Sequence, residues 1–152
     1  MLFELLSDKV IQPRLQGTTK AEIIDELLLL LDSAGVFDSE SQRETARLDV
    51  LENEKLMSTG MQFGIAIPHA KTTAVSELVV CMGISQVPID FQSVDNQPSR
   101  IFLMTLSPPD RVGPHIRFLS EVGKLLKNKK VRNALVKAET SRDILRALGA
   151  PA

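Results

Sequence analysis

Two short, continuously apolar runs constrain the fold more than any other feature of the sequence. They span Leu78–Ile84 and Ile101–Leu106, and residues typical of turns bound each of them. A strand with one face in water alternates apolar and polar residues, whereas a run without alternation is typical of a strand covered on both faces. The two runs therefore predict interior strands of a sheet that carries helices on both sides.

Two helices are predicted ahead of these strands. A capping-box pattern begins the first helix at Thr19, and Gly35 ends it. Its five consecutive leucines exceed one apolar stripe, which indicates burial on more than one side, between a sheet and another helix. The second helix is expected to start at Asp38 or Ser39 and to run to about Lys55.

Shorter elements are expected around this frame. Val10–Gln12 can form an edge strand, and Val87–Phe91 is a possible further strand with Pro88 at its edge. Asp110 is expected to cap a helix, and two short helices follow near the C-terminus.

The order of these elements predicts the architecture. One strand, two helices, three or four short strands and two or three helices fit an α+β chain folded as a three-layer α/β/α sandwich with a mixed β-sheet. No repeat or linker interrupts the pattern, so we expect residues 1–152 to form a single domain.

The stretch from Ser58 to Ala70 departs from ordinary core-building patterns. Pro68 fixes its own φ and favours extended geometry at the residue before it, so it sets the backbone that presents His69. Gly60 and Gly64 permit positive φ or close backbone approach.

The polar groups of this stretch suggest an anion site. Ser58, Thr59 and Gly60 can line a pocket with hydroxyl and amide donors. From the residues alone, a glycine-bearing turn with a histidine that merely caps it explains the pattern equally well.

The chain contains two histidines, and both occupy special positions. His69 follows the Gly-Pro segment, and His115 lies in the first turn of a predicted helix, on its apolar stripe. A helix N-terminus attracts anions and favours a neutral histidine, which can hydrogen-bond a phosphate. A partly buried histidine satisfied by a backbone group remains the alternative. A two-histidine metal site lacks a third ligand, so neither a metal nor another cofactor is predicted.

Composition argues against several classes of function. The net charge is -1, and the chain has no Trp or Tyr, so nucleic acid is not an expected partner. The single cysteine, Cys81, lies in an apolar run and reads as a buried thiol in a reducing compartment. The longest apolar runs fall far short of the roughly 20 residues that span a bilayer, and the first residues lack a basic leader. A cytoplasmic protein without direct membrane insertion is therefore expected.

At the level of motifs, the sequence resembles the type-2 enzyme IIA family of the bacterial phosphotransferase system, which includes the fructose and mannitol IIA domains and the nitrogen-regulatory IIA protein. The resemblance runs from about Leu5 to Leu148. It rests on Ser58-Thr59-Gly60, Gly64-Ile65-Ala66-Ile67-Pro68-His69, Ile89-Asp90-Phe91, Asp95-Asn96-Gln97-Pro98, and His115 followed by Leu119 and Leu125-Leu126.

The resemblance implies a function for both histidines. In the family, the histidine of the Pro-His dipeptide accepts a phosphoryl group from the phosphocarrier HPr and passes it on, which implies that His69 is the phosphoacceptor. The second histidine, here His115, is implied to assist at the same site. A IIB protein or a regulatory target is the implied next partner, and a free-standing domain favours the nitrogen-regulatory type.

One position departs from the family pattern. The family usually has an Arg-Glu pair ahead of the Ser-Thr-Gly segment, and this chain has Asn53-Glu54. Candidate substitutes for the missing cation are Lys55, Lys71, Arg111 and Arg117. Two hypotheses follow: a phosphohistidine carrier, or a regulatory protein-binding module in which phosphorylation is weak or lost.

Overall fold

The computed structural model, which describes residues 2–111 and 113–151, contains one mixed five-stranded sheet. The strands are β1 (Ile11–Leu15), β2 (Ile65–Ala66), β3 (His69–Lys71), β4 (Val79–Ile89) and β5 (Ser99–Ser107). The helices are α1 (Leu2–Leu5), α2 (Lys20–Ser33), α3 (Glu40–Leu56), α4 (Gly113–Leu126), α5 (Lys129–Lys137) and α6 (Ser141–Ala147), with a 3-10 turn at Asp8–Val10.

The two long strands lie at the centre of the sheet. The strand order is β1-β4-β5-β2, and β3 also pairs with β5. β4 and β5 are antiparallel, whereas the other pairs are parallel. The predicted interior strands are thereby confirmed, and the predicted N-terminal edge strand is β1.

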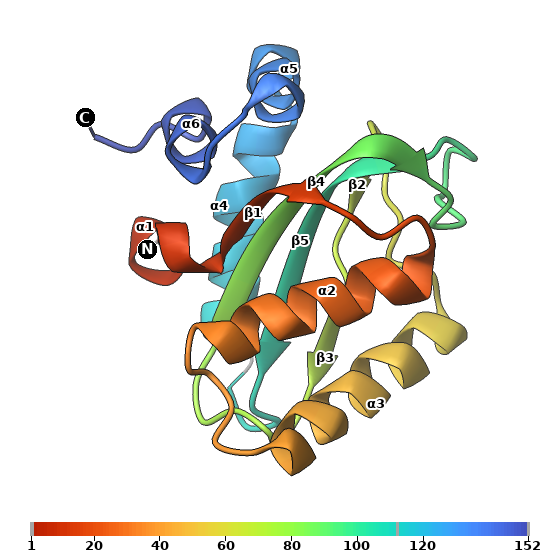
Figure 1. Ribbon diagram of the computed structural model, residues 1–152, viewed down its shortest axis with the longest axis vertical. Helices are drawn as coiled ribbons and strands as arrows, with labels where there is room; N and C mark the ends of the chain where they lie inside the picture. Colours follow the sequence, from red (N-terminus) through yellow and green to blue (C-terminus); the bar gives the residue numbers. More distant parts are fainter. Residues whose placement is uncertain (1, 112, 152) are drawn as a thin grey trace.

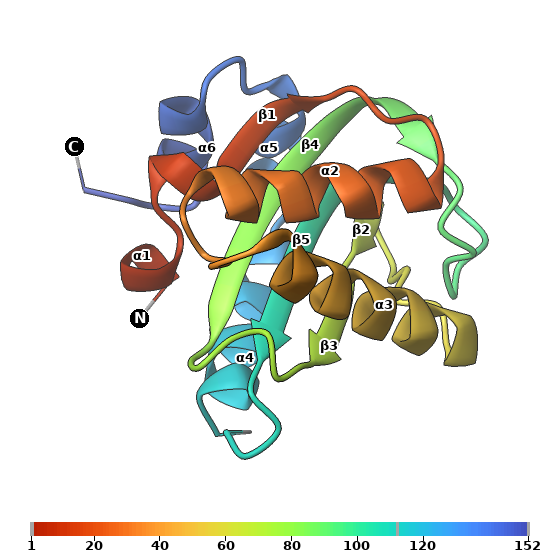
Figure 2. The same cartoon turned by 60° about the horizontal axis from the view of Figure 1, so that its bottom comes forward.

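Helices cover both faces of the sheet. α2 and α3 lie across one face, and α4 lies behind the other with α5 beside its C-terminal end (Figure 1). The same two layers are separated by β4 and β5 after rotation (Figure 2). The predicted three-layer α/β/α sandwich is confirmed.

One strand prediction was correct only in part. Residues 87–89 are extended, but they continue β4 through an irregularity in its pairing with β5 and do not form a separate strand, and Phe91 lies outside it. The Ser85 hydroxyl accepts from the Val87 amide at 3.3 Å and donates to the Val87 carbonyl at 2.6 Å. These local bonds bend the strand without ending it.

The helix starts follow the predicted caps in part. Thr19 and Ser39 each accept a hydrogen bond from the amide three residues later, at 3.2 Å. At the first helix the capping box is incomplete, because the Glu22 carboxylate accepts from Thr18 and not from the Thr19 amide. Asp110 lies in a turn before α4, and the position that precedes this helix, residue 112, lies outside the described residues.

Burial of α2 follows its leucine run. Leu27, Leu28 and Leu31 are buried, and Leu29 is exposed. The helix packs against α3 as well as β4 and β1, as the excess of leucines predicts.

A buried carboxylate fixes the chain between α3 and β2. Glu54, in the last turn of α3, is only 7% exposed. It accepts from the Thr59 amide at 2.8 Å and the Thr59 hydroxyl at 2.5 Å, and Lys20 of α2 pairs with it at 3.1 Å. Because a buried carboxylate needs both donors and a cation, this cluster holds two helices and the loop in one arrangement.

We expect Glu54→Gln to lower the free energy of unfolding by about 2 kcal/mol, because its amide group would face the Thr59 donors and the Lys20 cation with a further donor. Urea unfolding followed by far-UV circular dichroism measures the loss. The matched control is Glu52→Gln, an exposed carboxylate on the same helix, for which we expect a change within about 0.5 kcal/mol. Equal stability of the two variants would contradict a structural role for Glu54.

Candidate functional site

The backbone of His69 is held from two sides. His69 is the first residue of β3 and lies opposite Thr105 of β5. The Thr105 amide donates to the Pro68 carbonyl at 3.1 Å, and the Asn53 side-chain amide donates to the His69 carbonyl at 3.0 Å. The chain therefore enters β3 in a fixed direction, as the Pro-His dipeptide predicts.

The orientation of the His69 ring follows from one hydrogen bond. Nδ1 lies 2.8 Å from the Ile67 carbonyl oxygen. A carbonyl can only accept, so Nδ1 carries the proton, and Nε2 of the neutral ring keeps its lone pair. Within the part of the chain that the structure describes, Nε2 makes no hydrogen bond, so it is available as a nucleophile.

His115 lies beside this ring. The two ring centroids are 5.9 Å apart, with an angle of 56° between the planes. His115 is half-buried, and its Nε2 lies 2.9 Å from the Thr105 hydroxyl. Burial, and then repulsion from Lys71 and from His69 when that ring is protonated, lower the pKa of His115 below its usual 6.5. The neutral form of the His115 ring is therefore favoured at pH 7.

Both histidines border one pocket of about 490 Å³. The other lining residues are Asp49, Glu52, Asn53, Leu56, Ala70 and Lys71. Of the four cations considered as substitutes for a family arginine, Lys71 lines this pocket, and Lys55, Arg111 and Arg117 do not. The charges around the histidines are thus mixed, with one lysine and two carboxylates.

The predicted phosphate-binding residues are engaged away from this pocket. Ser58 donates its hydroxyl proton to the Phe91 carbonyl, and the Gly60 amide donates to the Ser58 hydroxyl at 3.1 Å. Both donors of Thr59 point to Glu54. A phosphate-binding role for Ser58, Thr59 and Gly60 stays a prediction, and it requires these bonds to be exchanged.

Two glycines between Ser58 and Ala70 are explained by the backbone of this stretch. A Cβ at Gly60 would lie 2.8 Å from Cα of Ser93, so no larger residue fits there without movement. Gly64 has φ 75°, which favours glycine. Both roles match the expectation of close approach or positive φ.

Two functional contacts escaped sequence reasoning. Thr105 connects the two histidines, since its amide fixes Pro68 and its hydroxyl pairs with His115. The signal was a threonine inside the apolar run Ile101–Leu106. The Asn53 contact to the His69 carbonyl had no signal, because it depends on where the end of α3 meets β3.

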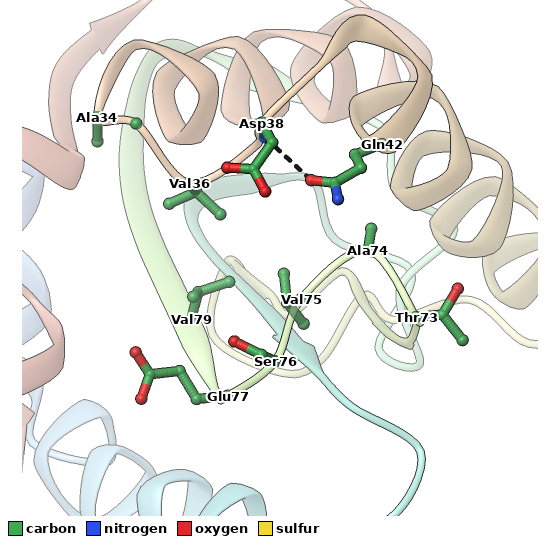
Figure 3. Close-up of a pocket in the computed structure, with 11 residues that line it drawn as sticks. Ala34, Val36, Asp38, Gln42, Thr73, Ala74, Val75, Ser76, Glu77 and Val79 are labelled. Carbon is green, nitrogen blue, oxygen red and sulfur yellow. Dashed lines mark hydrogen bonds between the residues drawn. The ribbon is translucent and has the colours of Figure 1, made fainter.

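A second pocket, of about 460 Å³, lies between the α2–α3 connection and the β3–β4 loop (Figure 3). Asp38 and Gln42 lie on one side of it, and Ser76 and Glu77 on the other. Gln42 accepts from the Asp38 amide at 2.9 Å. No histidine lines it, and residues 2–111 and 113–151 contain no group of three or more side chains placed to hold a metal ion. None of the described helices is long and apolar enough to cross a membrane.

Comparison with known proteins gives relatives of both sugar and regulatory type. The chain is 37% identical to the fructose-specific EIIA component of Haloferax volcanii over 83% of this chain and 80% of that protein. It is 32% identical to the fructose-specific EIIABC component of Bacillus subtilis over 93% of this chain, and it spans only 22% of that protein. A nitrogen regulatory protein of Bradyrhizobium diazoefficiens is 28% identical over 97% of this chain and 94% of its own length.

The fold is shared with solved structures of the same kind. The nitrogen regulatory protein IIA-Ntr from Neisseria meningitidis superposes with a TM-score of 0.84 at 24% identity, over 95% of this chain and 97% of that one. The mannitol IIA of Escherichia coli, in a complex with phosphorylated IIB, gives 0.78 at 19% identity, over 95% and 98%. Residues 4–150 match the family described as "Phosphoenolpyruvate-dependent sugar phosphotransferase system, EIIA 2". The chain belongs to this type-2 EIIA family of the phosphotransferase system.

Proposed function

We propose that the chain is a phosphohistidine carrier. It accepts a phosphoryl group on Nε2 of His69 from an HPr-type phosphocarrier, and it passes the group to a IIB-type protein or uses it for regulation. The observation that carries this proposal is the Nδ1–H bond to the Ile67 carbonyl, which leaves Nε2 with its lone pair beside an open pocket. An imidazole nitrogen of this kind attacks phosphorus at neutral pH without a separate base.

The proposed step is a direct exchange of one N–P bond for another. The lone pair of His69 Nε2 forms a bond to phosphorus while the N–P bond of the donor's phosphohistidine breaks. The electron pair of that bond returns to the donor's imidazole nitrogen, and the phosphoryl group keeps its oxygens. Such a transfer asks the protein for positioning and charge stabilisation.

His115 is proposed to assist and not to accept. Its Nε2 is paired with the Thr105 hydroxyl, so the hydrogen bond that remains for a phosphate comes from Nδ1. If the Thr105 hydroxyl donates to Nε2, Nδ1 carries the proton and can donate it toward a phosphate on the neighbouring ring. The ring centroids lie 5.9 Å apart, so a phosphate bonded to the His69 ring would lie beside the His115 ring.

One observation supports the second candidate, a regulatory binding module with weak phosphorylation. Asp49 and Glu52 line the His69 pocket, and the neutral Asn53 stands where the family usually has arginine. Carboxylates disfavour a phosphate dianion, and Asn53 cannot offset its charge. Phosphorylation by enzyme I, HPr and phosphoenolpyruvate, read as intact mass, separates the two functions. The relatives carry both fructose and nitrogen-regulatory names, so either role fits the carrier.

We expect His69→Ala to abolish the gain of phosphate mass in this assay, because the only nucleophile of the proposed step is removed. His115→Ala should still gain the mass, at a lower rate. The phosphate should be lost on brief acid treatment, as expected of an N–P bond. If His69→Ala kept the mass gain and His115→Ala lost it, the roles would be reversed.

We expect the imidazole of His115 to titrate below 6.5 in the unphosphorylated protein, because burial and nearby positive charge disfavour its cationic form. The folded protein then binds fewer protons than the unfolded chain between that pKa and 6.5, so the free energy of unfolding falls as pH is lowered through this range. His69→Gln should raise the pKa of His115, since it removes the charge that His69 carries when protonated, and a phosphate on His69 should raise it further. Ring-proton shifts followed by NMR against pH measure all three states. A midpoint at or above 6.5 in the unphosphorylated protein would contradict the proposed neutral donor.

We expect Asn53→Arg to accelerate phosphorylation of His69 by HPr roughly ten- to thousandfold, with the upper part of this range set by the roughly hundred- to thousandfold effect of one oxyanion-type contact. Arginine offers a planar, permanently charged fork to phosphate oxygens, and position 53 lines the His69 pocket. The variant also loses the Asn53 bond to the His69 carbonyl. Asn53→Ala, which loses that bond without adding charge, is therefore the control. An unchanged rate in a folded Asn53→Arg protein would show that another cation, with Lys71 the nearest candidate, already supplies the charge.

A further inference from the structure

A small apolar groove lies between the turn that precedes β2 and the C-terminal half of α4. Its volume is about 260 Å³, less than the roughly 300–1,000 Å³ of most small-molecule sites. Its size suits one or two side chains of a peptide. The lining residues are Met61, Gln62, Phe63, Ile65, Ile67, Val94, Gly123, Leu126 and Lys127.

Phe63, which forms the aromatic wall of this groove, has an unfavourable backbone conformation. Phe63 and Gly64 form the centre of a tight turn, with φ of 64° and 75°. The Ile65 amide donates to the Gln62 carbonyl at 3.4 Å across the turn, and the Met61 amide donates to the Ile65 carbonyl at 2.7 Å beside it. Turns with two positive φ values favour Asn and Gly at these positions. The Phe63 side chain is 56% exposed, so core packing does not explain an aromatic residue there.

The opposite wall contains a residue that helix stability does not favour. Gly123 lies inside α4, where glycine weakens a helix. A Cβ built at Gly123 meets nothing within 4 Å, so no neighbour forces the small residue. Two locally unfavourable residues therefore line the same groove: Phe63 forms one wall, and Gly123 leaves the opposite side open.

The rim of the groove is basic and ordered. The guanidinium of Arg132 lies 4.3 Å from the Phe63 ring centroid, and it donates to the Leu126 and Lys127 carbonyls at 2.8 Å. Among the described residues, neither Arg132 nor Lys127 forms an ion pair with a carboxylate. Asp95 is the nearby acid, and it accepts from the Phe63 and Gln97 amides.

We propose that this groove binds a segment of a partner protein that carries a large apolar side chain next to acidic residues. The apolar side chain enters between Phe63 and Gly123, and the carboxylates meet Lys127 and the free N–H groups of Arg132. Arg132 and the tight turn hold the walls in place before binding, which lowers the entropy lost on association. Gly123 follows His115 by eight residues in α4, which places it about 12 Å along the helix axis from that residue. The proposal does not depend on phosphorylation of His69.

The test uses two short synthetic peptides with a central leucine, one flanked by glutamates and the other by lysines. Each is titrated to millimolar concentration into ¹⁵N-labelled protein. We expect the glutamate peptide to shift the amide resonances of Gly64, Gly123 and Lys127 in a saturable way. The lysine peptide should bind about tenfold more weakly or not at all, because its charges repel the rim.

Two variants separate binding from folding. Phe63→Asn places a residue that tolerates positive φ in the turn, and Gly123→Leu fills the groove with a better helix former. Phe63→Asn should keep the thermal midpoint close to that of the unchanged protein, because the relieved positive φ offsets the lost Arg132 contact, and Gly123→Leu should raise it. Both variants should bind the glutamate peptide roughly tenfold to a hundredfold more weakly. Leu48→Gln, an exposed apolar residue of α3 outside the groove, is the matched control and should leave binding unchanged.

Three results would overturn the proposal. They are the absence of shifts with the glutamate peptide at millimolar concentration, equal binding of the two peptides, and a lowered thermal midpoint in both groove variants. The last result would mean that Phe63 and Gly123 serve the fold.

Discussion

The pairing of β3 with β5 is the constraint on which the site depends. It places His69 opposite Thr105, and Thr105 contacts both histidine segments, through its amide to Pro68 and through its hydroxyl to His115. β5 is a central strand, buried along nearly its whole length. A central strand opens only in near-global unfolding, so Thr105 gives both histidine segments an anchor in the core. The geometry that the proposed phosphoryl transfer needs is thus anchored to a buried strand.

The charges that line the His69 pocket disfavour a phosphate, although the geometry of His69 favours its attack on phosphorus. His69 offers a nucleophile in a fixed tautomer, yet the lining residues supply one lysine against two carboxylates. A phosphoryl group brings further negative charge, so the proposed carrier would gain most from a partner that contributes cations to this pocket at the moment of contact. Asn53 positions the backbone of His69 through its bond to the His69 carbonyl, and it brings no charge to the pocket. In the proposed carrier, the rate of transfer would therefore depend on the cations that the partner supplies.

The sequence predicted correctly those structural features whose cause is local. The unbroken apolar run of Leu78–Ile84 marks a covered strand wherever it occurs, and Pro68 restricts its neighbours whatever the fold. It did not find Glu54 as a buried residue, because its burial depends on Lys20, which is distant in the sequence, and on the loop that brings Thr59 back to it. It predicted a separate strand at Val87–Phe91, whereas two hydrogen bonds between Ser85 and Val87 let β4 continue without a turn. The hydroxyls of Ser58 and Thr59 looked available in the sequence, and only tertiary contacts show them engaged.

Ile67 connects the phosphoryl site to the apolar groove. Its carbonyl holds the proton of His69 on Nδ1, and its side chain lines the groove beside Phe63. A ligand in the groove affects His69 only if it binds two arrangements of this segment with different affinities. The backbone around Ile67 argues against a large movement, because its amide donates to the Thr59 carbonyl at 3.1 Å and Thr59 is tied to the buried Glu54. That frame allows only small rotations of the Ile67 peptide, which would lengthen or shorten the bond that selects the His69 tautomer. The nucleophilicity of Nε2 is therefore the property through which an occupied groove would act on the proposed carrier.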